Sequence, residues 1–322
     1  MTEKIRFGII GCGGIAARFA NALKKSDCAE LYACAARDPE RARAFAGAHG
    51  AALACESYEA LIRDGKVQAV YIATVHTAHA AVARQCLRAG KPVLCEKPFF
   101  VNGEEAEETV ALAREKQVLM MEGFWTRTQP AFLKAREWIR EGRIGRLTLI
   151  RAAFCFANPC TERTKHGRLW DPALGGGALL DAGVYPYEYV TGLMGGEPDD
   201  VRTSVVRGPT GVDATVAMAL RYDSGVLADC LASIEGRADT AATLSGTEGF
   251  ILQEYFPGCR RTQLYGNGGE LLETFEDPEE EGFVHEIAHF VRCLREGRTE
   301  SDLIPLRDTL AFARFADRVL RG

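Results

Sequence analysis

The first third of the chain alternates short apolar runs with amphipathic segments. Uniformly apolar runs predict strands at residues 5–10, 31–36, 69–73, 92–95 and 118–121. Helical spacing of apolar residues predicts helices at residues 16–25, 39–47 and 79–88. Apolar strands that alternate with helices are typical of a parallel sheet covered on both faces. We therefore predict a doubly wound α/β domain over residues 1–124.

The pattern changes after residue 124. Residues 132–141 predict a helix, and residues 146–156 predict a strand. Farther on, Gly, Pro, Asn and Asp separate several β runs, at 201–206, 215–222, 226–233, 242–244 and 260–265. Segments 284–295 and 306–320 predict closing helices, and the acidic run 276–281 a solvated loop. Residues 125–322 therefore predict an α+β domain with a large, mostly antiparallel open sheet.

Composition excludes several classes of protein. With 47% apolar and 26% charged residues among 322, the chain has the balance of a soluble globular protein of two domains. A net charge of −5 disfavours a nucleic-acid partner. No long apolar run predicts a membrane span, and the N-terminus lacks a secretory pattern, so we expect a cytoplasmic protein. The 11 cysteines include no C-x-x-C pair and no zinc spacing, which favours reduced, mostly buried thiols.

A glycine-rich motif directly follows the first predicted strand. It reads Gly11-x-Gly13-x-x-Ala16, between an apolar strand and a helix. Gly11 permits a tight turn, Gly13 lets a pyrophosphate approach the backbone, and Ala16 keeps the helix close to the strand. The helix N-terminus offers N–H groups and a positive dipole end to phosphates. This context predicts a dinucleotide site.

The end of the second strand bears on the choice of cofactor. Arg37 and Asp38 follow this strand, and Arg41 lies one helical turn beyond. An acidic residue there binds a ribose 2′-hydroxyl, whereas an arginine accommodates a 2′-phosphate. Because Arg37 comes first, we expect NADP(H) to be favoured, with NAD(H) possible. The alternative is that both arginines are surface charges and Asp38 caps the next helix.

Two further segments bear candidate catalytic groups. Glu96-Lys97-Pro98 ends an apolar strand, and ligands of doubly wound sheets bind beyond the carboxyl ends of strands. The run "GGGALLDAGVYPYEYV" spans residues 175–190. On a helix its Asp181, Tyr185 and Glu188 share one face. Tyr187 and Tyr189 lie nearby, and packing alone is the alternative role for any of these tyrosines.

Together these motifs resemble the glucose–fructose oxidoreductase/inositol dehydrogenase (Gfo/Idh/MocA) family. The resemblance rests on the glycine motif, "YIATVHTAHA", Glu96-Lys97-Pro98 and "GGGALLDAGVYP", and it covers essentially the whole chain. It implies an N-terminal Rossmann domain and a C-terminal domain whose open sheet supports a homodimer or higher oligomer. It also implies that Lys97 is the catalytic-site lysine and that Asp181 is the family's aspartate.

Two departures refine this resemblance. Many members have histidine where this chain has Tyr185, and many have T-P-N where it has Thr74-Val75-His76. Tyr185, with Trp125 and Arg127 upstream, resembles the dihydrodiol dehydrogenase and xylose dehydrogenase branch. The expected cofactor contacts come from the glycine loop, the end of the second strand and two further loops: Gly11, Gly13, Gly14, Ile15, Ala16, Arg37, Asp38, Thr74, His76, His79, Glu96 and Lys97.

These residues predict an NAD(P)-dependent dehydrogenase acting on a CH–OH group of a sugar, cyclitol or trans-dihydrodiol. Tyr185 is the candidate acid/base, and the Lys97 ammonium would lower its pKa from about 10 toward neutrality. Asp181 would orient the lysine or a substrate hydroxyl. Trp125, Arg127 and Phe156 are candidate substrate contacts. The alternatives are core packing for Trp125 and Phe156, and a carboxylate partner for Arg127.

Three alternatives are weaker. The first is a dinucleotide-binding sensor without catalytic activity, but a sensor has no chemical need for Lys97, Asp181 and Tyr185 together. A redox-neutral, NAD-dependent glycosidase occurs in the same family. The letters H-E-x-x-H at 285–289 match a zinc-protease motif, but the predicted fold differs and no third ligand is evident, so we expect no metal. His166 lies in a polar loop and predicts a surface residue.

Overall fold

The chain folds into two compact units. The computed structural model describes residues 3–321. One unit runs to Phe124 and takes in the later segment Phe283–Ala313, and the other comprises Trp125–Gly282 and the residues from Arg314 onward. The chain thus first changes unit after residue 124. It then returns, because residues 283–313 pack with the first unit rather than with the second.

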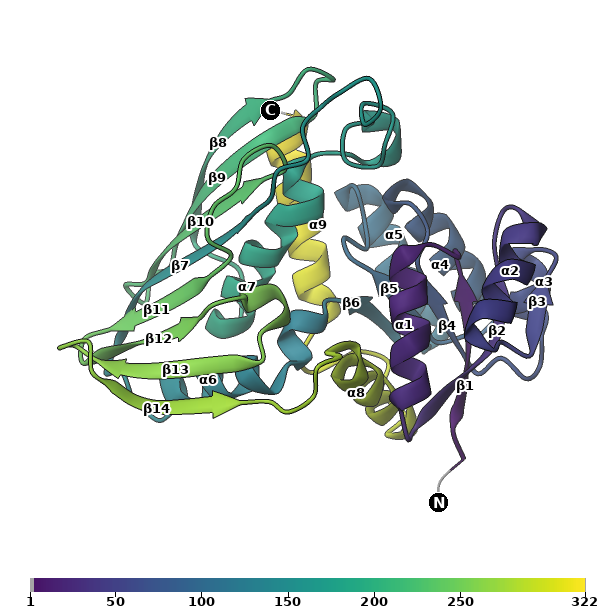
Figure 1. The fold of residues 1–322 in the computed structure, drawn as a ribbon, viewed down its shortest axis with the longest axis horizontal. Coiled ribbons are helices and arrows are strands. Elements are labelled where there is room, and N and C mark those ends of the chain that lie inside the picture. The colour runs from purple at the N-terminus through teal and green to yellow at the C-terminus, as the bar shows by residue number, and fades with distance from the viewer. Residues whose placement is uncertain (1–2, 322) are drawn as a thin grey trace. The chain divides into compact units, whose positions relative to one another are not determined.

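A parallel six-stranded sheet forms the centre of the first unit (Figure 1). Its strand order is β3-β2-β1-β4-β5-β6. The bounds are β1 Ile5–Ile10, β2 Ala29–Ala35, β3 Leu53–Cys55, β4 Ala69–Ile72, β5 Val93–Glu96 and β6 Met120–Gly123. The order reverses at β1 and β4, and such a switch point is where doubly wound sheets bind ligands. The predicted Rossmann sheet is confirmed.

Helices cover both faces of this sheet, which explains its uniformly apolar strands. They are α1 Gly14–Lys25, α2 Pro39–His49, α3 Tyr58–Arg63, α4 His79–Arg88, α5 Gly103–Lys116 and α8 Phe283–Arg295. Two successive residues of β1 face opposite layers. The Phe7 ring lies 5.7 Å from Phe19 of α1 and 5.6 Å from Phe290 of α8. A Cβ at Gly8 would instead collide with Leu61 of α3.

The second unit contains an eight-stranded sheet in the order β14-β13-β12-β11-β7-β10-β9-β8. All of its pairings are antiparallel except that of β7 with β10, so the predicted mostly antiparallel sheet is confirmed. The bounds are β7 Leu147–Cys155, β8 Asp200–Arg207, β9 Asp213–Arg221, β10 Leu227–Ser233, β11 Ala242–Gly246, β12 Gly249–Gln253, β13 Arg261–Gly266 and β14 Leu271–Glu276.

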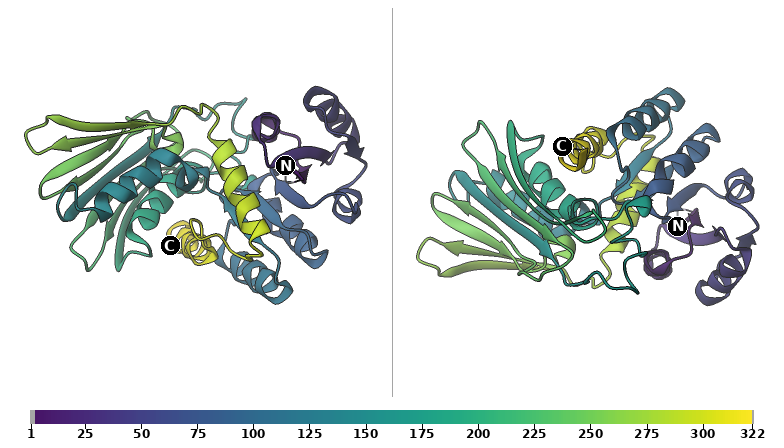
Figure 2. Two further views of the ribbon diagram at one scale, coloured as in Figure 1. Left: turned by 90° about the horizontal axis from the view of Figure 1, so that it is seen from below. Right: turned by 90° about the horizontal axis from the view of Figure 1, so that it is seen from above.

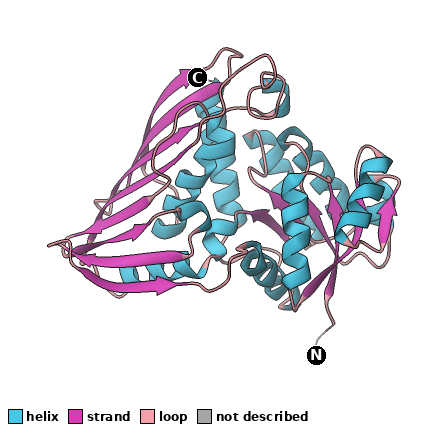
Figure 3. Ribbon diagram, in the orientation of Figure 1, coloured by secondary structure: helices cyan, strands magenta, loops and turns pink. Residues whose placement is uncertain are grey.

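Helices lie on only one face of the large sheet (Figures 2 and 3). They include α6 Pro130–Arg140 and α7 Val184–Met194, and a π-helical turn, Leu179–Gly183, leads into α7. The last helix, α9 Leu306–Arg321, passes from the first unit into the second. None of the described helices has the length and apolar composition needed to cross a bilayer.

Candidate active site

The glycine loop after β1 is shaped for a phosphate ligand. Gly11 has φ +96°, and a Cβ there would lie 2.5 Å from the carbonyl oxygen of Ala73. Only glycine fits, because the loop passes close to the end of β4. A Cβ at Gly13 or Gly14 would meet nothing within 4 Å. The backbone at the start of α1 is therefore open, and this is where the predicted pyrophosphate would bind. Ile15 is exposed beside it, whereas Ala16 is fully buried.

The end of β2 presents two arginines to solvent. Asp38 caps α2, since its carboxylate accepts the Glu40 N–H at 3.0 Å. Arg41 reaches back to the glycine loop, where its Nη2 donates to the Cys12 carbonyl at 3.1 Å. Arg37 is exposed. Because Asp38 is engaged as a cap, the cations are the groups best placed to meet a ligand here.

The loop after β4 holds Thr74, His76 and His79. The His79 ring joins two loops, because Nδ1 lies 3.0 Å from the Pro98 carbonyl and Nε2 lies 3.1 Å from that of Thr74. Burial lowers the pKa of His79 to about 4. The neutral ring has one N–H and so donates to only one of these carbonyls. His76 is also buried, with its ring 5.8 Å from that of His79.

Lys97 emerges directly after β5, at the same edge of the sheet as the glycine loop. It is half-buried, and the Lys97–Pro98 peptide is cis. Glu96 is buried behind it and accepts a hydrogen bond from the Tyr71 hydroxyl. Burial raises the pKa of Glu96, while Tyr71 and the Lys97 cation oppose this rise. Glu122, which the sequence analysis missed, accepts the Phe99 N–H at 2.9 Å and so fastens the turn that contains Lys97.

Asp181 lies in the π-helical turn of the second unit. It is only 5% exposed, and its carboxylate accepts a hydrogen bond from the exposed Arg168. The sequence analysis singled out His166 in the loop 161–171 as a surface residue, which it is, but missed Arg168. Arg168 belongs to no periodic pattern or motif in the sequence, so its pairing with Asp181 could be found only from the fold.

The glycine run before Asp181 leaves space for the carboxylate of Asp213. Gly177 has φ +126°, and a Cβ there would collide with the Asp213 carboxylate. Asp213 accepts the Leu179 N–H at 2.5 Å and so caps the turn that carries Asp181. Burial raises the pKa of Asp213 to about 6, although the Leu179 hydrogen bond opposes this. No motif or periodicity singles out Asp213 in the sequence.

Tyr185 begins α7 and is half-buried. Its ring makes an edge contact with Phe154, at 4.9 Å between centroids. Phe156, two residues along, lies 5.7 Å from Phe154 and is partly buried. By contrast, Tyr187 stacks on Phe315 and is 1% exposed. Among the three clustered tyrosines, Tyr185 is therefore the one with an accessible side chain.

Arg127 is buried within the second unit. Its Nε and Nη2 donate to the Glu188 carbonyl at 2.9 and 2.6 Å, and Nη2 also donates to Thr191 Oγ1 at 2.8 Å. A Cβ at Gly192 would lie 2.5 Å from Arg127 Nε, so this glycine makes space for the guanidinium. The geometry favours an internal role for Arg127. Trp125 is likewise 7% exposed and packs beside Gly258.

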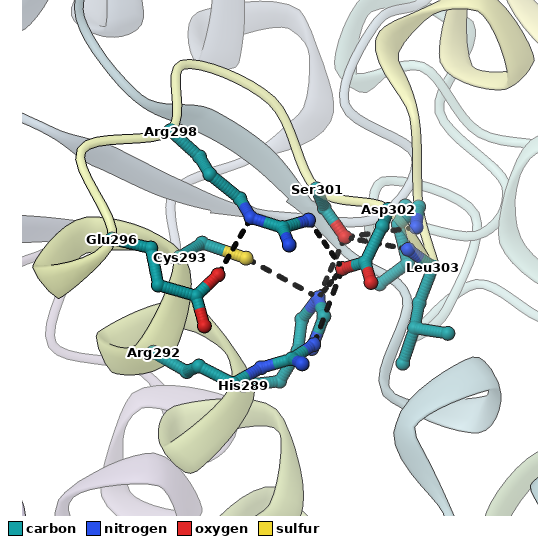
Figure 4. Close-up of polar contacts among 9 residues, drawn as sticks. His289, Arg292, Cys293, Glu296, Arg298, Ser301, Asp302 and Leu303 are labelled. Carbon is teal, nitrogen blue, oxygen red and sulfur yellow. Dashed lines mark hydrogen bonds and ion pairs between the residues drawn. The ribbon is translucent and has the colours of Figure 1, made fainter.

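The H-E-x-x-H letters do not form a zinc-protease site. Glu286 is fully buried, and burial together with the charges of Glu96 and Glu122 raises its pKa. His289 instead lies beside Cys293, Ser301 and Asp302 (Figure 4). Arg292 donates to His289 Nδ1 at 2.9 Å, and a guanidinium can only donate. Nε2 of the neutral ring therefore carries the proton and donates to Ser301 Oγ at 2.7 Å.

A glycine loop at the switch point of a parallel sheet, with a lysine at the end of β5, is the arrangement of a dinucleotide-dependent oxidoreductase. Comparison with known proteins agrees. Residues 5–124 match "Oxidoreductase family, NAD-binding Rossmann fold", and residues 132–252 match "GFO/IDH/MocA C-terminal domain". The chain belongs to the Gfo/Idh/MocA family, as the sequence motifs indicated.

Relatives match over nearly the full length. The trans-1,2-dihydrobenzene-1,2-diol dehydrogenase of Homo sapiens is 36% identical, with 99% of this chain and 96% of that protein covered. The Bos taurus protein of the same name is 35% identical with the same coverage. KijD10, a 3-ketoreductase from Actinomadura kijaniata in complex with NADP and TDP-benzene, has a TM-score of 0.85 at 29% identity, over 99% of this chain and 98% of that one. Aldose-aldose oxidoreductase from Caulobacter crescentus shares the fold, with a TM-score of 0.87 at 22% identity over 99% and 97%.

Proposed function

We propose that this oxidoreductase is an NADP(H)-dependent dehydrogenase acting on a hydroxyl of a sugar, cyclitol or trans-dihydrodiol. The observation that carries the proposal is Lys97, half-buried at the end of β5, on the edge of the sheet that bears the open glycine loop. The relatives named for a dihydrodiol and the 3-ketoreductase crystallised with NADP support the substrate and cofactor classes.

The nicotinamide, when bound, supplies or accepts the hydride. Tyr185 takes the hydroxyl proton during oxidation and returns it during reduction. Lys97 provides the positive charge that favours the phenolate. Asp181, whose carboxylate also pairs with Arg168, is a positioning residue that orients the lysine or a substrate hydroxyl. Phe156, which is only partly buried, supplies apolar surface for a ring, whereas the buried Trp125 packs internally.

The cofactor contacts divide by region. The backbone from Gly11 to Ala16 takes the pyrophosphate, and Arg37 takes a 2′-phosphate. Arg41 supports the loop through the Cys12 carbonyl. Thr74, His76, His79, Glu96 and Lys97 surround the nicotinamide end. The exposed Arg37 supports the preference for NADP(H) over NAD(H), whereas the cap formed by Asp38 is what the surface-charge alternative also predicts.

We also propose that the protein is a homodimer through the uncovered face of the large sheet. Strand register aligns one row of residues across that face: Leu227, Leu149, Ser245, Phe250, Tyr265 and Leu271. Leu227 is 48% exposed and Leu271 is 53% exposed. An exposed row that is apolar except for Ser245 is typical of an interaction surface.

The test is nicotinamide absorbance with NADP+ or NAD+ and a panel of aldoses, inositols and trans-cyclic diols. We expect reduction of NADP+, and we expect Lys97→Ala and Tyr185→Phe to lower kcat by roughly 10²–10⁴-fold. Tyr187→Phe is the matched control, since its stacking on Phe315 is retained. Near-normal turnover by Tyr185→Phe would refute the acid/base role. Tight cofactor binding without any reduction of NADP+ or NAD+ would favour a sensor. Hydrolysis of a glycoside without net reduction of the cofactor would favour a glycosidase.

A further inference from the structure

A strand in the apolar core of the first unit carries a hydroxyl group. The sequence of β4 is AVYI, and its Tyr71 is fully buried. The Tyr71 ring stacks on Phe19 of α1, with 3.6 Å between the ring centroids, and a phenylalanine would stack in the same way. The hydroxyl donates a hydrogen bond to the buried carboxylate of Glu96. Since Glu96 directly precedes Lys97, the hydroxyl has a role that packing alone does not explain.

The turn that contains Lys97 is held on both sides of the lysine. On its C-terminal side, the Phe99 N–H donates to the carboxylate of Glu122 on β6 at 2.9 Å. On its N-terminal side, the Tyr71 hydroxyl binds the side chain of Glu96. Both contacts are buried hydrogen bonds, and such bonds are costly to break. They limit how far the backbone of Lys97 can move, and therefore where its ammonium group can lie.

The same hydroxyl affects the charge next to the lysine. Burial raises the pKa of Glu96, whereas the hydrogen bond from Tyr71 and the charge of Lys97 oppose this rise. A hydrogen bond donated to a carboxylate favours its ionised form. Without the hydroxyl, Glu96 is protonated more readily, and Lys97 then loses part of the opposite charge that stabilises its ammonium form.

We propose that Tyr71 is a positioning residue for the reaction, because its hydroxyl holds Glu96 and Glu96 in turn holds the position and the charge of Lys97. The inference rests on the proposed function, in which Lys97 is the catalytic lysine. Tyr71 is fully buried, so it contacts neither the substrate nor the cofactor and acts through Glu96. Loss of the hydroxyl should therefore lower turnover and leave the affinity for the dinucleotide nearly unchanged.

The first experiment is a double-mutant cycle. Tyr71→Phe removes the hydroxyl and keeps the ring that stacks on Phe19. We expect this change to lower kcat by about tenfold, while the affinity for NADPH, measured by fluorescence titration, stays within about twofold. In the Lys97→Ala protein, Tyr71→Phe should cause no further loss of kcat. An equal further loss in that background would show that Tyr71 does not act through Lys97, and would overturn the proposal.

Tyr189→Phe is the matched control. Tyr189 is a fully buried tyrosine of the second unit, and its hydroxyl donates to Gln253 at 2.6 Å. This variant loses the same kind of buried hydrogen bond at another place in the chain. We expect both tyrosine variants to have a lower Tm than the parent, and Tyr189→Phe to keep the kcat of the parent. Equal losses of kcat in the two variants would mean that lost stability explains the effect.

A second measurement needs no turnover. Acetic anhydride acylates neutral amines rather than ammonium groups, and peptide mass spectrometry gives the rate of acylation at Lys97. At pH 8 we expect faster acylation of Lys97 in Tyr71→Phe than in the parent, and the parent rate in Tyr189→Phe. Equal rates in Tyr71→Phe and the parent would overturn the inference. Faster acylation in Tyr71→Phe, with a parent that reduces neither NADP+ nor NAD+, would refute the proposed function and leave the positioning of Lys97 supported.

Discussion

At the scale of single residues, cofactor choice depends on a charge at the end of β2. Arg37→Ala should weaken NADPH binding by roughly 10- to 100-fold while NADH binding stays nearly constant, because a hydrogen bond to a charged group contributes about 1.5–3 kcal/mol. Fluorescence titration with both cofactors measures the ratio.

The control for this change is Arg43→Ala on α2. Arg43 pairs with Glu40 and Glu56, at 2.6 and 3.0 Å, so its loss should leave both affinities unchanged. If Arg37→Ala weakens the binding of NADPH and of NADH equally, Arg37 does not bind the 2′-phosphate.

Candidate residues were predictable where local sequence carries the signal. Gly11, Gly13 and Lys97 could be placed because the strand before each one fixes its position at the sheet edge. Arg168 and Asp213 could not be predicted, since they reach Asp181 and Leu179 across 13 and 34 residues of sequence. Such contacts depend on tertiary packing, which no periodicity records.

At the scale of elements, α8 brings a carboxyl group into the core of the first unit. Glu286 is fully buried, and within the described residues neither of its oxygens has a hydrogen-bond partner. Burial raises its pKa well above the usual value, with Glu96 and Glu122 adding to the rise. Tyr71 also interacts electrostatically with it. The folded state therefore binds a proton that the unfolded state releases at lower pH.

The raised pKa of Glu286 determines how the free energy of unfolding changes with pH. As pH rises above the unfolded pKa of about 4.3, the unfolded chain loses the proton first, so the free energy of unfolding falls. Glu286→Gln keeps the shape of the side chain and removes this fall. We expect the Tm of the variant to match the parent near pH 4 and to exceed it increasingly toward pH 8.

Thermal unfolding across this range checks the expectation, with about 2–4 °C corresponding to 1 kcal/mol for domains of this size. Glu59→Gln on α3 is the control, since Glu59 is exposed and should show no such trend. Parallel Tm curves for Glu286→Gln and the parent would mean that Glu286 is ionised in the folded state.

The turn that carries Asp181 depends on Gly177. Gly177→Ala forces a side chain into φ +126° and against the Asp213 carboxylate. We expect destabilisation of about 1–3 kcal/mol from the backbone alone, and a larger loss of kcat than of cofactor affinity. Chemical denaturation and steady-state kinetics measure the two effects, with Gly195→Ala, which has φ +79° but no crowding, as the control. Equal kinetics in both variants would contradict a positioning role for the turn.

Most long elements could be predicted, but short and edge elements could not. The alternation of apolar runs gave β1 and α4 with the observed bounds. The strands β3 and β12 were not predicted, because three to five residues are too few to show a clear periodicity. The edge strand β14 was not predicted because its sequence, LLETFE, lacks alternation of apolar and polar residues and runs into the acidic segment 276–281. The helix that contains Tyr185 was predicted without the π-helical turn, Leu179–Gly183, that leads into it.

At the scale of the whole molecule, the return of the chain to the first unit was not predictable. An amphipathic helix such as α8 needs an apolar partner, but its sequence does not say which sheet provides it. The choice is made by aromatic contacts, since Phe290 lies 5.6 Å from Phe7 and Phe283 lies 6.1 Å from Phe19. Both partners lie more than 260 residues earlier in the chain, on β1 and α1.

The uncovered face of the large sheet gives a prediction about assembly. Leu227 and Leu149 lie opposite each other on β10 and β7, and Phe250 stacks on Tyr265 in the same row. A charge in this row leaves the fold of one chain intact but must be desolvated in an interface, which costs several kcal/mol. We expect the parent to have twice the chain mass of 35.1 kDa and Leu227→Lys to have the mass of one chain.

Light scattering coupled to size-exclusion chromatography measures both masses. Tyr255→Lys is the control, because Tyr255 is 52% exposed but lies outside the row, so this variant should remain a dimer. Dissociation by Tyr255→Lys but not by Leu227→Lys would place the interface elsewhere. A parent with the mass of one chain would leave the apolar row exposed to solvent, and dimer formation would then have no part in the function of this protein.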